Sequence, residues 1–135
     1  TIDSAPGAYK LDISIGGKAS FGFVSKYVKG KTVPTGNTEF QFKAAGLNFS
    51  STAYDWLVVS GATKAQFRGT GTLNGAPGYS FRVTVVDGGK TGVDQFRIQI
   101  WSGTGPVYDN GSGTDDIDGS NNQDISSGQI VIHTK

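Results

Sequence analysis

The chain has 135 residues, a formal net charge of +1, and neither cysteine nor methionine. This length fits a single domain, and the lack of cysteine excludes disulfide bonds, a thiolate zinc site and a thiol nucleophile. Glycine occurs 21 times, about twice its average frequency, which favours short strands joined by tight turns. No apolar run approaches the roughly 18 residues of a membrane-spanning helix, so no membrane span is expected.

Alternating apolar and polar residues predict a series of short strands. The first is Lys10–Ile15, in which Leu11, Ile13 and Ile15 share one face. Similar runs follow at 19–24, 38–43, 64–73, 79–85 and 96–101, with shorter ones at 106–108 and 129–133. The apolar run Tyr54–Val59 predicts a central strand that is buried on both faces.

Turn-forming residues separate these runs. Asn74-Gly75 is a strong signal for a tight hairpin, because both residues tolerate positive φ. Gly69 and Gly71 interrupt an alternating run, which predicts a bulge or a close approach of two backbones. No long window has the period of a helix. The sequence therefore predicts an all-β fold: a single-domain antiparallel β-sandwich, jelly-roll or immunoglobulin-like, with about 8 to 10 short strands and essentially no helix.

The N-terminal segment, residues 1–15, is a candidate for self-association. Its predicted strand, with Leu11, Ile13 and Ile15 on one face, can pair in its own sheet or add to the sheet of a neighbouring copy. Repeated head to tail, donation of this strand would assemble a fibre. An ordinary edge strand of the same subunit is the alternative.

Acidic residues are concentrated between residues 109 and 124, a stretch with five Asp and no Lys or Arg. The rest of the chain carries twelve Lys and Arg against six acids, a charge of +6. Calcium binds six to eight oxygen ligands, so this stretch is a candidate calcium site. It does not match the EF-hand pattern, and a solvated acidic loop is the alternative. The candidate ligands are Asp109, Asp115, Asp116, Asp118 and Asp124.

Trp101 is the aromatic residue that the pattern places on the outside of a strand. Strict alternation puts Phe96, Ile98 and Ile100 on one face and Trp101 on the other. Exposed aromatic rings stack on the C–H faces of sugars, so Trp101 and Tyr108 form a candidate platform for a glycan. Packing of these rings in the core is the alternative.

Catalysis and nucleic-acid binding find little support. His133 is the one histidine, and the chain has neither a Gly-x-Ser-x-Gly nor a His-Glu-x-x-His motif. We therefore expect no enzyme activity and no required cofactor, with Ca²⁺ as the alternative. A sequence pI near 7.9 and the acidic stretch argue against nucleic acid as a partner.

Eight stretches of the chain, in the same order and spanning nearly its whole length, carry a family resemblance. They are Ser4–Tyr9, Gly17–Tyr27, Gly36–Phe42, Leu47–Val59, Gly69–Thr72, Gly92–Trp101, Val107–Asn110 and Gly128–His133. The chain resembles a small C-terminal all-β domain of secreted bacterial surface proteins, which often carry PKD-, HYR- or cadherin-like repeats. The family usually has prolines between the first two stretches, where this chain has Leu11, Ile13 and Ile15. The resemblance implies an exported, non-catalytic module and brings no defined ligand.

These observations predict a non-catalytic extracellular structural or adhesive module of a bacterial surface protein. It would act through sheet-edge association with other copies of itself or with other surface proteins, by strand donation in a fibre. The alternative function is a calcium-assisted carbohydrate-binding module that uses Trp101 and the acidic stretch.

Overall fold

A computed structural model describes residues 1–26, 35–60, 63–88, 92–113, 117 and 120–125. Within these ranges the chain is almost entirely strand, and the one helical element is a single 3₁₀ turn, η1 (Lys43–Ala45). The strands are β1 (Ile2–Ser4), β2 (Gly17–Lys26), β3 (Thr35–Phe42), β4 (Leu47–Ser60), β5 (Lys64–Leu73), β6 (Ala76–Val86), β7 (Gln95–Ser102), β8 (Gly105–Asp109), β9 (Ser112–Gly113), β10 (Ser120–Asn121) and β11 (Gln123–Asp124). The predicted all-β antiparallel fold with essentially no helix is confirmed.

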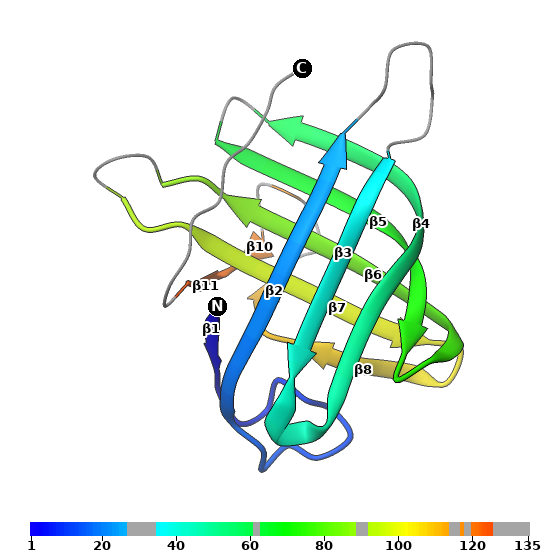
Figure 1. The fold of residues 1–135 in the computed structure, drawn as a ribbon. Helices are drawn as coiled ribbons and strands as arrows, with labels where there is room; N and C mark the ends of the chain where they lie inside the picture. Colours follow the sequence, from blue (N-terminus) through cyan, green and yellow to red (C-terminus); the bar gives the residue numbers. More distant parts are fainter. Residues whose placement is uncertain (27–34, 61–62, 89–91, 114–116, 118–119, 126–135) are drawn as a thin grey trace.

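The strands from β1 to β8 follow one another in a single sheet (Figure 1). Each pairs with its neighbour in sequence, so the described sheet is a meander. β11 pairs with the start of β7, and β9 and β10 form a small separate ribbon. The finer prediction of a jelly-roll or immunoglobulin-like sandwich is not confirmed, because those folds divide their strands between two sheets with Greek-key connections.

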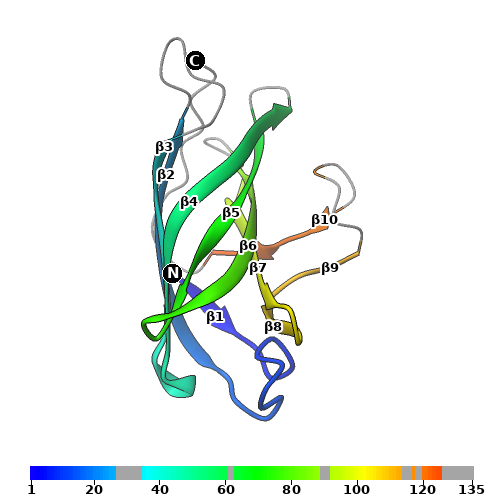
Figure 2. The same ribbon diagram turned by 90° about the vertical axis from the view of Figure 1, so that its right-hand side faces the viewer.

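A bend in β4 folds this one sheet back over itself. The pairing of β4 with β5 shifts register between Ser51 and Ala53 and again between Tyr54 and Trp56. Such irregularities bend a strand and increase its twist. As a result β2 and β3 cross over β5, β6 and β7 at a steep angle, and the two parts of the sheet enclose the core (Figures 1 and 2).

Two glycines of β5 make this bend sterically possible. A Cβ atom at Gly69 would collide with the carbonyl oxygen of Ala53, and one at Gly71 would collide with that of Ser50. The predicted close approach of backbones at Gly69 and Gly71 is confirmed. The predicted tight hairpin is confirmed too, since Asn74 and Gly75 link β5 to β6 with φ values of 52° and 85°.

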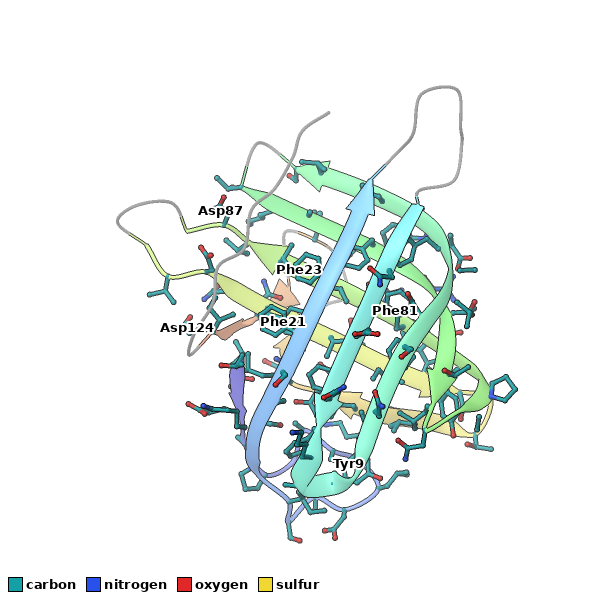
Figure 3. All side chains as sticks on the ribbon, in the orientation of Figure 1. Tyr9, Phe21, Phe23, Phe81, Asp87 and Asp124 are labelled. Carbon is teal, nitrogen blue, oxygen red and sulfur yellow. The ribbon has the colours of Figure 1, made fainter. Side chains whose placement is uncertain are left out.

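Aromatic rings fill the space between the two parts of the sheet. Phe21 of β2, labelled in Figure 3, stacks on Phe96 of β7 with ring centroids 4.0 Å apart, although these strands are far apart in the sheet order. The largest fully buried side chains are Tyr108, Phe40, Phe42, Phe49, Phe67, Phe81, Phe96, Ile2, Ile98, Ile100 and Val83. Burying a side chain of this size contributes about 1.5–3 kcal/mol, so these rings are the main source of stability.

The N-terminal segment connects the two ends of the sheet. Strand β1 pairs with β2, and the chain then runs alongside β8. There the backbone N–H of Lys10 donates to the carbonyl of Val107 at 2.7 Å, and that of Asp109 donates to the carbonyl of Ala8 at 3.0 Å. The hydroxyls of Ser4 and Tyr108 are hydrogen-bonded at 2.7 Å inside the core. Residues 1–10 therefore pair within their own subunit.

The strand predicted at Lys10–Ile15 is wrong, because these residues form turns. The carboxylate of Asp12 accepts hydrogen bonds from the backbone N–H and the hydroxyl of Ser14, at 3.1 and 2.6 Å. Local bonds of this kind compete with strand pairing. Leu11 and Ile13 are each 66% exposed, whereas Ile15 packs against the core.

The apolar run in β4 is not buried on both faces as predicted. Leu57 packs against the core, but Val58, on the opposite face, is 48% exposed. The strand belongs to a single curled layer, so only one of its faces meets the core. The strand predicted at residues 129–133 lies outside the described residues.

Candidate functional site

The outer face of the sheet, opposite the core, carries a row of polar and aromatic side chains. Residues that are directly paired across neighbouring antiparallel strands point to the same side of a sheet. The row starts at β4 and ends at β8, and its members in order are Trp56, Arg68, Arg82, Gln99 and Asp109. This face is therefore distinct from the Phe-rich face.

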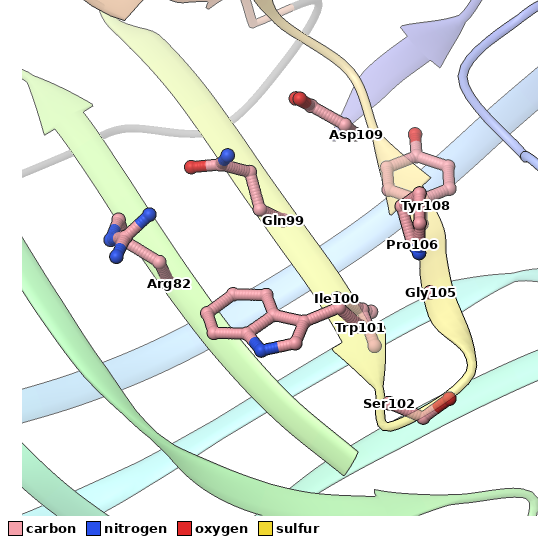
Figure 4. Close-up of a pocket in the computed structure, with 9 residues that line it drawn as sticks. All are labelled: Arg82, Gln99, Ile100, Trp101, Ser102, Gly105, Pro106, Tyr108 and Asp109. Carbon is pink, nitrogen blue, oxygen red and sulfur yellow. The ribbon is translucent and has the colours of Figure 1, made fainter. Parts of the chain in front are cut away.

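Trp101 extends over this row from β7. The alternation predicted for β7 is confirmed, because Phe96, Ile98 and Ile100 are buried in the core and Trp101 lies partly exposed on the other side. Figure 4 shows the indole reaching from β7 toward β6, the strand that carries Arg82. We call Trp101 and its surroundings the Trp101 face.

Two guanidinium groups flank the indole of Trp101. The Cζ atom of Arg68 lies 5.4 Å from the ring centroid and that of Arg82 lies 5.5 Å from it. A cation within about 6 Å of an aromatic ring is attracted by the electron-rich ring face. Trp101 thus holds both arginines close to its own ring, at the surface.

A groove of about 430 Å³ opens beside the indole, between β6, β7 and β8 (Figure 4). Its wall combines the aromatic ring of Trp101 and the exposed ring of Pro106 with the polar groups of Arg82, Gln99 and Ser102. Ligand sites in proteins commonly have this composition, an apolar surface with a few hydrogen-bonding groups. The remaining lining residues are Ile100, Gly105, Tyr108 and Asp109.

A buried ion pair supports one end of the groove. Arg97 is only 2% exposed, and its Nε and Nη2 atoms donate to the two carboxylate oxygens of Asp109, both at 2.9 Å. Its Nη1 atom donates to the carbonyl of Ser112 at 3.1 Å. A two-pronged pair of this kind fixes geometry as well as charge. The Asp109 carboxylate is therefore neutralised and held in place.

Asn110 is a structural residue that the sequence pattern did not reveal. Its Oδ1 atom accepts a hydrogen bond from the backbone N–H of Ile98 at 2.7 Å, and its Nδ2 atom donates to the carbonyl of Phe96 at 2.9 Å. The side-chain amide thus pairs with β7 as a backbone amide of a neighbouring strand would. It fills the gap between the parts of β7 that pair with β8 and with β11.

Tyr108 is wrong as a glycan platform, because its side chain is 0% exposed and its hydroxyl is bonded to Ser4. Burial raises the pKa of Tyr108 to about 12. The predicted pair of platform residues therefore separates, with Trp101 at the surface and Tyr108 in the core. Alternation alone could not assign β8, which is a short run of only five residues.

Two of the five predicted calcium ligands are described, and they lie apart. Asp109 pairs in register with Gln99 and Asp124 with Gln95, four residues earlier on β7, which corresponds to roughly 13 Å. Asp109 is bound to Arg97, and an oxygen of Asp124 accepts from the side chain of Gln95 at 2.9 Å.

Asp115, Asp116 and Asp118 lie outside the described residues. In the part of the chain that the structure covers, no three His, Cys, Asp or Glu side chains are grouped closely enough to hold a metal ion. The calcium site stays a prediction.

Comparisons of the chain with family models, with curated proteins and with solved structures find no match. The resemblance to a domain of secreted bacterial surface proteins therefore stays a prediction. No helix in the described ranges is long and apolar enough to cross a membrane.

Proposed function

We propose that this protein is a non-catalytic binding module that holds a carbohydrate against the Trp101 face. The observation that carries the proposal is a partly exposed indole on the outer face of the sheet, beside a groove with amide, hydroxyl and guanidinium groups. The C–H faces of a sugar ring stack on an aromatic surface, while side chains such as Gln99 and Ser102 hydrogen-bond its hydroxyls.

The charge of the groove supports a binding role rather than hydrolysis. A glycosidase normally uses a pair of carboxyl groups on either side of the scissile bond. Among the described residues that line the groove, Asp109 is the one carboxylate, and Arg97 binds both of its oxygens. A carboxylate whose two oxygens both accept from a guanidinium has neither oxygen free to deliver a proton to a glycosidic bond.

Association between copies of the chain is a second candidate function. It is supported by the turn that carries Leu11 and Ile13, since two large apolar side chains are each 66% exposed within three residues. Contact between apolar side chains on different molecules would remove this surface from water. This kind of association would use an exposed turn, whereas the association predicted from the sequence would use a donated strand.

The location that we propose is outside the cell, on a bacterial surface, in a structural or adhesive role. Support for it comes from the resemblance of eight sequence stretches to a domain of secreted surface proteins. A carbohydrate-binding face is consistent with such a location, because cell surfaces and their surroundings are rich in glycans.

A screen against immobilised oligosaccharides tests the carbohydrate proposal directly. The wild-type protein should bind a subset of them, and Trp101→Ala should lose that binding while it keeps the same melting temperature. Val58→Ala, an exposed outer-face change on β4, is the matched control and should bind as wild type does. Unchanged binding by Trp101→Ala would exclude the Trp101 face as the site.

A further inference from the structure

We propose that the carbohydrate held at the Trp101 face is acidic, with a carboxylate bound jointly by Arg68 and Arg82. This inference rests on the proposed function and names the ligand class for the same site. It starts from the positions of the two arginines, which are a directly opposed pair on neighbouring strands.

Two like charges directly opposite each other on antiparallel strands repel, which is destabilising. Arg68 of β5 and Arg82 of β6 are such a pair, and both guanidinium groups also lie close to the ring of Trp101. Side chains in this arrangement start about 5 Å apart at Cβ, so one anion can contact both. A bound carboxylate would turn a repulsive pair into a binding site.

The guanidinium of Arg68 is partly exposed and only weakly paired within the described part of the protein. Its Nε atom is buried and has no hydrogen-bond partner within the described part of the chain. Asp55 forms a surface ion pair with it, with 3.6 Å between its Oδ2 atom and Nη1, and exposed pairs of this kind contribute little.

The carboxylate that lines the groove does not oppose an anionic ligand. Arg97 covers both oxygens of Asp109 at 2.9 Å, so the charge of Asp109 is already balanced. Arg68 and Arg82 place two positive charges close to the indole, and the carboxylate of Asp55, 3.6 Å from Arg68, offsets part of the charge of Arg68.

The site has two parts, the guanidinium groups and the indole ring. A carboxylate attached to a sugar fits both parts better than a free inorganic anion does. The planar guanidinium fork matches a planar carboxylate, which it binds through two parallel hydrogen bonds. The indole close to the two arginines adds an aromatic surface, which an isolated anion cannot use. A uronic acid carries both features, since its carboxylate is attached to a sugar ring with C–H faces.

Calorimetric titration with a matched pair of ligands tests the inference. The pair is a trisaccharide of galacturonic acid and its carboxyl-reduced counterpart, which has the same ring and no charge. Wild type should bind the acidic trisaccharide about tenfold more tightly or better, which is the expected size of a charge-assisted hydrogen bond.

Arg82→Gln and Arg68→Gln should each lower the affinity for the acidic trisaccharide much more than the affinity for the neutral one, and so remove most of this preference. Lys18→Gln, an exposed change on β2, removes the same charge at a residue that does not line the groove and should keep the preference. If Arg68→Gln lowers the melting temperature, Arg82→Gln alone decides the test.

The outcomes separate the two proposals. Equal affinity of wild type for the acidic and neutral trisaccharides would overturn the acidic-ligand inference and leave the carbohydrate proposal in place. An acidic preference that survives both arginine substitutions would also overturn it. If wild type binds neither trisaccharide, and the oligosaccharide screen is negative as well, both proposals fail.

Discussion

At the scale of single residues, Asn110 shows how one side chain completes a sheet. Strand β8 ends at Asp109, and β11 pairs with β7 only at Phe96 and Gln95. The amide of Asn110 satisfies the backbone groups that remain between them. The alternation of apolar and polar residues cannot reveal this role, because a polar side chain here replaces the pairing of a backbone strand.

Asn110→Ala should lower the free energy of unfolding by roughly 1–3 kcal/mol, because it removes the side-chain acceptor of the Ile98 N–H and the bond to the carbonyl of Phe96. Urea unfolding of the two proteins measures the difference. Asn37→Ala, an exposed change on β3, is the control and should change stability by about 0.5 kcal/mol or less. Equal losses for the two variants would mean that the Asn110 bonds are dispensable.

Ionisation of Tyr108 lowers the free energy of unfolding at alkaline pH. Its pKa rises from 10.0 in the unfolded chain to about 12 in the fold, so the folded state holds the proton more tightly. The stability from this group is complete below about pH 10 and is lost as the pH rises toward about 12. Burial raises the pKa of Tyr54 too, so a variant is needed to isolate Tyr108.

Between pH 9 and 12, wild type should lose roughly 2–3 kcal/mol more unfolding free energy than Tyr108→Phe, since one pKa unit corresponds to about 1.4 kcal/mol. Chemical denaturation at several pH values measures both curves. If the free energies of unfolding of the two proteins fall in parallel as the pH rises, Tyr108 has the same pKa in the folded and unfolded states. Near neutral pH, Tyr108→Phe itself should cost about 1 kcal/mol through the lost bond to Ser4.

At the scale of elements, the bend in β4 depends on the glycines opposite it. Gly69→Ala should destabilise the fold by roughly 2–4 kcal/mol, because the new Cβ would collide with the backbone of β4. Gly22→Ala on β2 is the matched control, since a Cβ there meets no atom within 4 Å. Thermal unfolding of both variants compares them. A Gly69→Ala protein as stable as Gly22→Ala would show that β4 adjusts without cost.

Most of the elements were predictable from local signals. Strands β5 and β7 match their alternating runs closely, and the hairpin follows from Asn74-Gly75. The N-terminal strand was misplaced because Asp12 and Ser14 form a local turn that alternation does not encode. The single curled sheet could not be inferred either, because the pattern gives the face of each strand and not its partner.

The candidate site was predictable only in part, for a similar reason. The position of Trp101 on the outer face follows from alternation within β7. Its neighbours Arg68 and Arg82 come from two other strands, so their meeting depends on cross-strand register. The same holds for Arg97 and Asp109, whose ion pair removes Asp109 from the set of available calcium ligands.

At the scale of the whole molecule, carbohydrate binding should not require calcium. Asp109, the carboxylate among the described residues that line the groove, is paired with Arg97. Its charge is therefore balanced by a guanidinium rather than by a metal ion. Addition of EDTA should therefore leave the affinity of the Trp101 face unchanged, as measured by calorimetry with and without Ca²⁺. A large loss of affinity in EDTA would restore the calcium-assisted alternative and connect the acidic stretch to the site.

The most direct test of the central claim is an amide and indole NMR titration with a bound oligosaccharide from the screen. The chain has two tryptophans, so the spectrum contains two indole N–H signals that Trp101→Ala assigns. We predict that the Trp101 signal shifts with added ligand, together with backbone signals of β7 and β8, while signals of β2 and β3 stay in place. An unmoved Trp101 signal under saturating ligand would contradict the account.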